Sequence, residues 1–553
     1  MTDIEITKDA LIAAMKSIKS SSAPGPDELP TALYHRFAEE LAIPLQLIWR
    51  RSLDTGLMPE GTILAIIAPI FKGGDKGDKA NYRPVALTNH LTKIFERVLR
   101  LELVKHLEEN GLMNKTQHGF RARHSTITML LQYYDSILTM LEGKNEVDAI
   151  YLDLAKAFDK VDHDILLLKL YNLGIRGKIL TWIKEFLKNR KQKVRVEGCF
   201  SEPIWVLSGV PQGSVLGPLL FIIMMIDINE AIDSAQIGSF ADDTKLWQIF
   251  HMHEELQKDL EKLSQWINSN NLELNRKKFE HLHIGKNAGQ PFLTLDGEEI
   301  QTKEHVRDLG IYMSNDLTFK HHIVNMVGKA ITISSWILRT FRTRESYPMK
   351  ILLKSLLVPI LEYGSVLWSP NDQYLKNLIE NVQRKFTSRF LEFNEMDEET
   401  GMLRCSTNYW DRLKKLKIYS LERRRERYTI LFMHKVLTNW YPNPGFDFND
   451  ISFNDRLQSI SVRPKDDPKA EPWVRRLRAS SFFGKGPKLY ELVLTKLGGI
   501  EALEDPENHD KFKRKLDELL ATIPDQPTVE GLHRQALTNS ILDQIRHQTP
   551  NTN

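Results

Sequence analysis

The chain has 553 residues, of which 42% are hydrophobic and 27% are charged; this composition is typical of a globular protein and excludes a fibrous or disordered one. Its two cysteines, Cys199 and Cys405, exclude a disulfide framework or a cysteine-based zinc ribbon within the chain, and they favour a reducing intracellular compartment. The formal net charge is only +3, which by itself argues against a nucleic-acid enzyme. The longest apolar stretch, residues 215–226, is too short to span a bilayer, so we expect no membrane partner.

The hydrophobic pattern predicts alternating helices and strands in the first half of the chain and mostly helices in the second half. The first half is expected to hold a helix within residues 1–22, a rigid turn at 23–27, a strand at 62–70, a helix from about 84 to 110, a strand at 147–154, a helix or turn at 156–171, a β-hairpin at 193–206, a helix after 211–214, two short strands within 237–247 and a helix at 254–270. Beyond residue 326 we expect helices at 374–390 and 511–523, an irregular linker at 443–475 and a disordered tail after 545.

Three carboxylates stand out as candidates for chemistry. Asp242 and Asp243 are adjacent at the apex between two predicted strands, where their charges repel each other unless a cation neutralises them. Asp153 directly follows an apolar strand. Carboxylates that converge in this way could hold two Mg²⁺ ions for phosphoryl transfer, with Mn²⁺ as an alternative ion. The competing interpretations are an ordinary Asp-Asp surface turn and a helix N-cap at Asp153.

The near-zero net charge conceals regions of opposite sign. Residues 148–164 hold five acidic residues and two basic ones, whereas residues 412–427 hold eight basic residues and two acidic ones. The basic run is expected to be either a solvated helix face or a clamp on a nucleic-acid backbone that contributes salt-dependent affinity. Its candidate nucleic-acid-binding residues are Arg412, Lys414, Lys415, Arg423, Arg424 and Arg425.

Eight ordered motifs lie between residues 22 and 323, and matching segments downstream extend the resemblance over nearly the whole chain. The motifs are SAPGPDELP (22–30), PIFKGGDKGDKANYRPVAL (69–87), QHGFRARHST (117–126), YLDLAKAFDKVDH (151–163), SGVPQGSVLGPLLF (208–221), FADDT (240–244), LELNRKKFE (272–280) and VRDLGIYMSNDLTFKHHI (306–323). In this order they resemble the reverse transcriptase of non-LTR (LINE-type) retrotransposons, in particular the jockey-like and chicken-repeat-like group.

The resemblance implies an α+β fold of the right-hand polymerase type, with fingers, a palm built on an antiparallel sheet, a helical thumb and a mostly helical C-terminal region. The implied boundaries are 1–145 for the fingers and N-terminal segment, 146–325 for the palm, 326–440 for the thumb and basic region, and 441–553 for a linker and C-terminal extension. The implied activity is RNA-directed DNA polymerisation by two-metal phosphoryl transfer.

The resemblance also assigns roles to single residues. It implies that Asp153, Asp242 and Asp243 are the catalytic carboxylates and that the carbonyl of Leu154 assists metal binding. Phe158 is implied to be a steric gate against the ribose 2′-hydroxyl, and Gln212 and Gly213 are implied to line the base-pair pocket. Lys278 is implied to lie near the triphosphate, Arg83 and Lys93 to bind the incoming nucleotide, and Arg121 to have a template or structural role. Without the motifs, Phe158 would be taken as a core residue, Pro-Gln-Gly as a turn and the basic residues as solvated.

Some features depart from the family pattern. Thr62 and Ile63 replace the usual Trp-Lys, and Phe279 replaces the usual Cys or Ser after the motif lysine. The chain starts directly at the polymerase, so we expect either an open reading frame truncated on its 5′ side or a separate fragment, with an endonuclease acting in trans. The expected partners are an RNA template, a DNA primer and deoxynucleoside triphosphates, in the nucleus, the cytoplasm or both.

Two alternatives remain open from the sequence. One is a domesticated, catalytically silent nucleic-acid-binding protein that keeps the fold, although the intact carboxylates argue against it. The other is an RNA-templated RNA polymerase, against which Phe158 argues.

Overall fold

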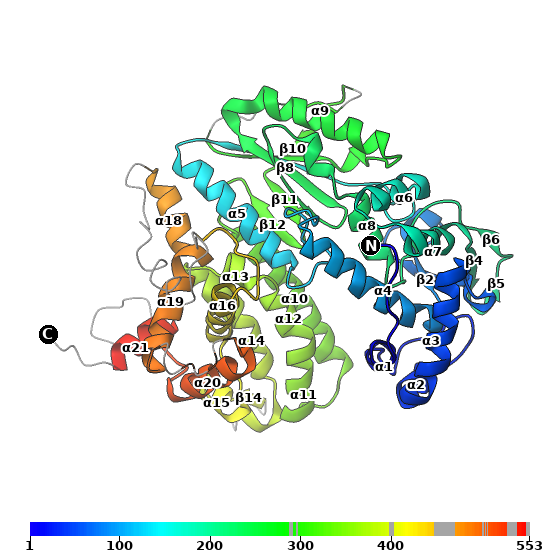
Figure 1. Cartoon of the computed structure of the whole chain (residues 1–553). Coiled ribbons are helices and arrows are strands. Elements are labelled where there is room, and N and C mark those ends of the chain that lie inside the picture. Colours follow the sequence, from blue (N-terminus) through cyan, green and yellow to red (C-terminus); the bar gives the residue numbers. More distant parts are fainter. Residues whose placement is uncertain are drawn as a thin grey trace.

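The computed structural model describes residues 1–286, 291–294, 297–396, 403–446, 470–499, 507–527 and 539–548, together with Leu503 and Asp505. It is a mixed α and β structure, as the sequence predicts. Figure 1 shows the N-terminal helices on one side, the C-terminal helices on the other, and a β-sheet between them. The helices that precede or accompany this sheet are α1 (Lys8–Lys16), α2 (Thr31–Arg36), α3 (Ala38–Thr55), α4 (His90–Glu109), α5 (Thr126–Glu142), α6 (His163–Asn172), α7 (Gly177–Lys188), α8 (Gly217–Met224) and α9 (His253–Ser269).

The central sheet has the strand order β10–β9–β3–β8–β7. Strand β3 lies in the middle and pairs antiparallel with β8 on one side and with β9 on the other. Its strands are β3 (Val147–Leu152), β7 (Gln236–Phe240), β8 (Asp243–Ile249), β9 (Glu280–Ile284) and β10 (Gln301–Thr302). A β-hairpin of β11 (His305–Asp308) and β12 (Ile311–Ser314) follows this sheet in the sequence.

A second sheet lies beside the N-terminal helices, where β1 pairs with β2 antiparallel and with β4 in parallel. Its strands are β1 (Leu64–Phe71), β2 (Tyr82–Leu87), β4 (Lys191–Val196), β5 (Cys199–Phe200) and β6 (Ile204–Trp205). Pro84 lies in β2 at the edge of this sheet, where a missing N–H costs no ladder hydrogen bond.

The C-terminal half is mostly helical. Its elements are α10 (Lys320–Thr340), α11 (Ser346–Leu352), a π-helical turn (Leu353–Leu357), α12 (Val358–Glu362), α13 (Ser365–Trp368), α14 (Gln373–Thr387), the hairpin β13 (Asn394–Met396) and β14 (Leu403–Cys405), α15 (Tyr409–Leu416), α16 (Leu421–Leu437), α18 (Pro472–Ser480), α19 (Phe482–Lys496), α20 (His509–Thr522) and α21 (Ile541–Gln548).

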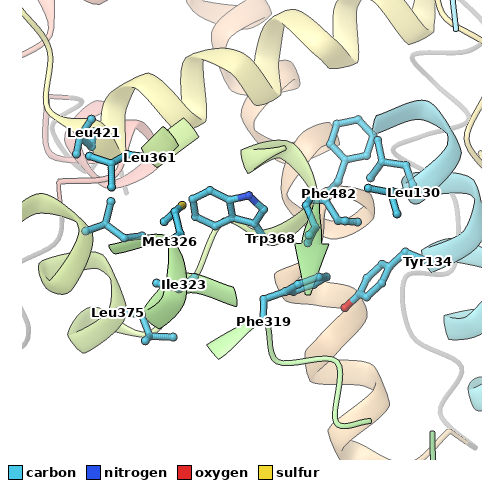
Figure 2. Close-up of a cluster of buried hydrophobic side chains, with 14 of the residues drawn as sticks. Leu130, Tyr134, Phe319, Ile323, Met326, Leu361, Trp368, Leu375, Leu421 and Phe482 are labelled. Atoms are coloured by element: carbon cyan, nitrogen blue, oxygen red, sulfur yellow. The ribbon is translucent and has the colours of Figure 1, made fainter. Parts of the chain in front are cut away.

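Two hydrophobic cores flank the central sheet. Val147 and Ala149 of β3 belong to one core, whereas Ile150 and Leu152 belong to the other, because successive side chains of a strand point to opposite faces. Figure 2 shows the first core, where Trp368 lies among side chains from α10, α12 and α19, and α5 contributes Leu130 and Tyr134. The sheet therefore joins the N-terminal and C-terminal halves.

Several predicted boundaries need correction. The helix predicted from about 84 is wrong at its start, because strand β2 occupies 82–87 and α4 begins at His90. The basic run 412–427 is not one segment: Lys417 has a positive φ of 51° that ends α15, and Ser420 caps α16. The tail predicted to be disordered after 545 is helical to Gln548. Residues 447–469 of the predicted linker lie outside the described residues.

Candidate active site

The three predicted carboxylates meet at one end of the central sheet. In the antiparallel pairing of β3 and β8, Leu152 lies opposite Thr244, so Asp153 follows directly opposite Asp243. Asp242 lies in the two-residue turn between β7 and β8, because Phe240 pairs with Asp243. The turn and the strand end thus bring together carboxylates that are 89 residues apart in the sequence.

Burial and neighbouring charges raise the pKa values of two of these carboxyl groups, Asp242 and Asp243. Partial desolvation, followed by the charge of Asp242, raises the pKa of Asp243 to about 6, even though its side chain reaches solvent. Burial and the nearby charge of Asp153 also raise the pKa of Asp242, whereas Arg83 and Lys278 act in the opposite direction. Without a cation, the cluster resists full ionisation. This is the behaviour expected of a site that binds a cation through carboxylate oxygens.

Gln117 holds the turn that carries Asp242. Its Oε1 accepts hydrogen bonds from the backbone N–H groups of Ala241 (2.8 Å) and Gly119 (2.7 Å), and its Nε2 donates to the carbonyl of Ala241 at 3.2 Å. Ala241 has a positive φ of 59°, which a non-glycine residue adopts at a cost. A Cβ at Gly119 would lie 2.3 Å from the Ala241 nitrogen, so glycine is required there. The motif segment 117–120 contains both Gln117 and Gly119, but sequence reasoning did not predict that they hold this turn.

Asp153 is oriented by the segment that precedes β9. Its Oδ2 accepts hydrogen bonds from Asn275 Nδ2 at 3.0 Å and from Lys278 Nζ at 2.8 Å. Backbone hydrogen bonds at Asp153 and at Ala155 hold the strand end to this segment. In this antiparallel bridge Leu154 lies opposite Leu274, and the two backbone hydrogen bonds are made by the residues on either side of Leu154. The carbonyl of Leu154 is therefore not used in the bridge. The structure therefore brings Lys278 to the carboxylates. Asn275 is a second ligand-orienting residue that the sequence did not single out.

A pocket of about 330 Å³ lies beside the carboxylates. Asp153, Asp243 and Lys278 line it, together with a buried ion pair between Lys245 of β8 and Asp308 of β11. The Lys245 ammonium also lies 4.2 Å from the centre of the Tyr133 ring. This pair connects the carboxylate cluster to the β11–β12 hairpin. It was not predicted, because nothing in the sequence marks Asp308 as the partner of Lys245.

The predicted gate and pocket residues lie in adjoining loops. The ring of Phe158 is half-buried and stacks on Phe221, with centroids 4.5 Å apart and planes 13° apart. The Gln212 carbonyl accepts a 2.6 Å hydrogen bond from the backbone N–H of Ala86, and a Cβ at Gly213 would lie 2.3 Å from the Ala86 carbonyl. The Pro-Gln-Gly loop therefore packs directly on strand β2. A backbone hydrogen bond from Val210 to the Phe158 carbonyl joins the two loops.

The three basic residues assigned to the fingers differ in their surroundings. Arg83 is exposed on β2 and close enough to Asp242 to lower its pKa. Lys93 is half-buried on α4, and burial lowers its pKa. Arg121 donates to the backbone carbonyls of Asn114 (2.8 Å) and Gln117 (3.3 Å), which favours its structural role over template contact.

The predicted basic clamp is wrong for three of its six members. The side chains of Arg412, Arg423 and Arg425 are buried, with exposed fractions of 4%, 0% and 1%. Arg423, for example, donates to the carbonyls of Ile523 and Pro524, each at 2.6 Å.

The other members reach the surface to different degrees. Arg424 pairs with Glu362, whereas Lys414 and Lys415 of α15 are exposed. Local charge density indicated a solvated face, but the C-terminal region covers much of it.

Within the described ranges, no helix combines the length and apolar character needed to cross a bilayer.

Comparison with known proteins finds a family match around this site. Residues 72–313 match the family model described as reverse transcriptase (RNA-dependent DNA polymerase). All three carboxylates, Lys278 and the Pro-Gln-Gly loop lie inside this range. The predicted resemblance is confirmed.

Relatives among mobile elements extend the match beyond this range. The chain is 29% identical over 397 residues to the RNA-directed DNA polymerase from mobile element jockey of Drosophila funebris, covering 69% of this chain and 43% of that protein. It is 26% identical over 381 residues to the probable RNA-directed DNA polymerase from transposon X-element of Drosophila melanogaster, covering 66% and 42%. A Pol polyprotein from the type-1 retrotransposable element R2 of Popillia japonica is 24% identical over 385 residues, covering 65% and 51%. The chain spans about half, or less, of the length of these relatives.

Proposed function

We propose that this chain, whose residues 72–313 match the reverse transcriptase family model, is an active RNA-directed DNA polymerase of a LINE-type retrotransposon. The observation that carries the proposal is the convergence of Asp153, Asp242 and Asp243 in one cluster whose mutual repulsion and burial raise the pKa values of Asp242 and Asp243. A silent descendant of the family has no need to keep this electrostatically costly arrangement.

The donor set fits hard divalent cations. Asp153, Asp242 and Asp243, with the carbonyl of Leu154, would hold two Mg²⁺ ions or, alternatively, Mn²⁺. When bound, such ions activate a primer 3′-hydroxyl and stabilise the oxygen that leaves from the α-phosphate. Gln117 and Asn275 keep the carboxylates in place during the reaction.

The remaining residues act on the incoming nucleotide. Lys278 is placed to neutralise the triphosphate and to give a proton to departing pyrophosphate, because its ammonium already reaches the carboxylate cluster. Arg83 lies on the same side, beside Asp242, and would bind phosphate oxygens. Phe158, fixed by stacking on Phe221, would exclude a ribose 2′-hydroxyl, and the Gln212–Gly213 loop would contact the template base pair.

The proposal extends to the architecture. Residues 1–145 would form the fingers, 146–325 the palm, 326–440 the thumb, and 441–553 a linker and extension. Most buried hydrophobic residues beyond position 305 gather in one core, which supports the boundary between palm and thumb, whereas the other core combines residues of the proposed fingers and palm. The proposed partners are an RNA template, a DNA primer, deoxynucleoside triphosphates and an endonuclease acting in trans, within the nucleus or cytoplasm.

Primer extension on an RNA template in Mg²⁺ tests the activity. We expect wild-type protein and an Asp233→Asn control, which alters an exposed aspartate, to extend the primer. Asp242→Asn should lose at least about 100-fold in rate, because a ligand to the reacting metal ions is lost. Absence of extension by the wild type would support the silent nucleic-acid-binding alternative.

The sugar preference separates a DNA polymerase from an RNA polymerase. Wild-type protein should incorporate deoxynucleotides and reject ribonucleotides, and Phe158→Ala should accept both. Phe200→Ala removes an exposed phenyl ring outside the site and serves as the matched control. If Phe158→Ala still rejects ribonucleotides, the gate assignment is wrong; if the wild type prefers ribonucleotides, the RNA polymerase alternative is favoured.

A further inference from the structure

A second polar cluster lies inside the central sheet, away from the candidate active site. Asp148 of β3 lies directly opposite His283 of β9, and His281 is on the same face of β9, two residues away. All three side chains are buried, with Asp148 and His281 at 0% exposure. Asp148 precedes Asp153 by five residues, which corresponds to about 16 Å along a strand. This cluster is therefore distinct from the three catalytic carboxylates.

The candidate ligand atoms face one another closely. Asp148 Oδ1 lies 2.7 Å from His283 Nδ1 and 3.0 Å from His281 Nε2. Zinc–nitrogen bonds of 2.0–2.1 Å in a tetrahedral site place ligand atoms about 3.3 Å apart. Side-chain shifts of a few tenths of an ångström would therefore admit an ion among these three atoms.

A third histidine lies beside the triad of Asp148, His281 and His283, whose ligand atoms all lie within 4.8 Å of one another. His253, the first residue of α9, has its Nδ1 3.9 Å from Asp148 Oδ2. Neither of these two buried atoms has a hydrogen-bond partner in the part of the chain that the structure describes. Hydrogen bonds from His281 and His283 satisfy Oδ1 alone, so they leave half of a buried carboxylate without a donor. Such an orphaned atom is costly, and a cation is one way to satisfy it.

One of the two outward-facing nitrogens of the β9 histidines is arranged as in metal sites. His281 Nδ1 lies 2.9 Å from the Thr302 hydroxyl, whereas His283 Nε2 lies 3.3 Å from Glu146 Oε2 without hydrogen-bond geometry. Metal-bound histidines commonly donate their second ring N–H to an oxygen in this way, which fixes the tautomer and the ring orientation. Phe292 packs against both His253 and His281 and shields the cluster from solvent.

We infer that Asp148, His281 and His283 bind one divalent transition-metal ion, with His253 as the fourth ligand after its side chain moves toward the triad; imidazole and carboxylate ligands favour Zn²⁺. The bound ion joins β3, β9 and the start of α9. Its role is structural: it holds β9 and the segment before β9, which orients Asp153, against β3, the strand that Asp153 directly follows. The inference does not depend on polymerase activity.

Metal content of the purified full-length chain tests the inference directly. We expect about one zinc per chain by elemental mass spectrometry, and tetrahedral d–d absorption bands after exchange with Co²⁺. Asp148→Asn and His283→Gln should lose the metal. His251→Gln, which changes an exposed histidine outside the cluster, should keep it. Wild-type protein without zinc after purification and after incubation with ZnCl₂ would overturn the inference.

Two peripheral variants keep the test decisive if a buried variant fails to fold. Thr302 is exposed, so Thr302→Val should fold and bind zinc about 10–100-fold more weakly through loss of the contact to His281. His253→Gln removes one ligand that is partly exposed, and it should also weaken binding and abolish the tetrahedral cobalt spectrum. Unchanged zinc affinity in both variants would refute the assigned ligand set.

Thermal unfolding provides an independent readout. A chelator that removes transition metals but spares Mg²⁺ should lower the Tm of the wild-type chain, and ZnCl₂ should restore it. The same treatment should leave the Tm of Asp148→Asn unchanged. A chelator-insensitive Tm in the wild type, combined with no bound zinc, would show that the cluster is a hydrogen-bonded Asp–His network.

Discussion

The turn that carries Asp242 depends on one buried side chain, and Gln117→Met removes its hydrogen bonds with little change in volume. The substitution leaves the backbone N–H groups of Ala241 and Gly119 without their acceptor. Because Gln117 is only 3% exposed, water cannot replace it without opening the structure. We expect the turn to rearrange, since Ala241 holds an unfavourable positive φ of 59°.

The expected cost follows from these contacts. A buried donor that loses its partner costs about 1–3 kcal/mol, so two of them predict a loss of about 2–6 kcal/mol in the free energy of unfolding. For a domain of this size, each 1 kcal/mol lowers Tm by about 2–4 °C. A displacement of Asp242 by about 1 Å should in addition lower the extension rate about 100-fold.

Single-turnover primer extension at saturating Mg²⁺ and nucleotide, combined with thermal unfolding, separates the two effects. Gln46→Met removes one hydrogen bond to the Ile6 carbonyl, remote from the turn, and should lower stability without lowering the extension rate of the folded protein. Gln117→Glu keeps an acceptor for both N–H groups and should be more stable than Gln117→Met. If Gln117→Met lowers Tm but extends the primer at the wild-type rate, Gln117 does not position the catalytic turn.

Three further predictions follow from charge and burial. The pKa of Asp243 is about 6 in the folded chain and its ordinary value is 3.8, so the metal-free fold should lose stability as pH rises from 3.8 to about 6. Mg²⁺ should offset this loss, and Mg²⁺ affinity measured by calorimetry should fall about tenfold per pH unit below 6. Lys245→Met or Asp308→Asn should each cost about 3–5 kcal/mol in denaturant unfolding, whereas Lys245→Met with Asp308→Leu should recover most of the loss. Replacing Lys414 and Lys415 by Gln should reduce the slope of log affinity against log salt by up to about 2 if both contact phosphates.

Each of these predictions has a contradicting result. A Mg²⁺ affinity that stays constant between pH 5 and pH 7 would exclude Asp243 as a titrating ligand. A double variant at 245 and 308 no more stable than either single variant would show that the ion pair does not act as a unit. An unchanged salt slope would remove α15 from the nucleic-acid interface. Arg423→Met, a buried control, should lower stability without altering that slope.

The sequence alone predicted the three carboxylates of the candidate site and the strands that carry them. Strand periodicity around Asp153 and around Asp242 predicted β3, β7 and β8, and antiparallel pairing of these strands is sufficient to bring the carboxylates together. The motif order also predicted the resemblance to reverse transcriptases, which the match of residues 72–313 to that family model confirms, and the motif lysine, Lys278, donates a hydrogen bond to Asp153. These features are local in sequence or are carried by contiguous motifs.

The tertiary structure decided which polar groups face solvent and which are hydrogen-bonded to one another. Arg423 and Arg425 belong to a basic run in the sequence, but α20 and the residues after it supply carbonyl groups to Arg423 about 100 residues later. In the same way, Gln117 reaches Ala241 across 124 positions, and His283 reaches Asp148 across 135. A residue's burial and its hydrogen-bond partners depend on segments far along the chain, so neither local charge nor hydrophobic period could predict them.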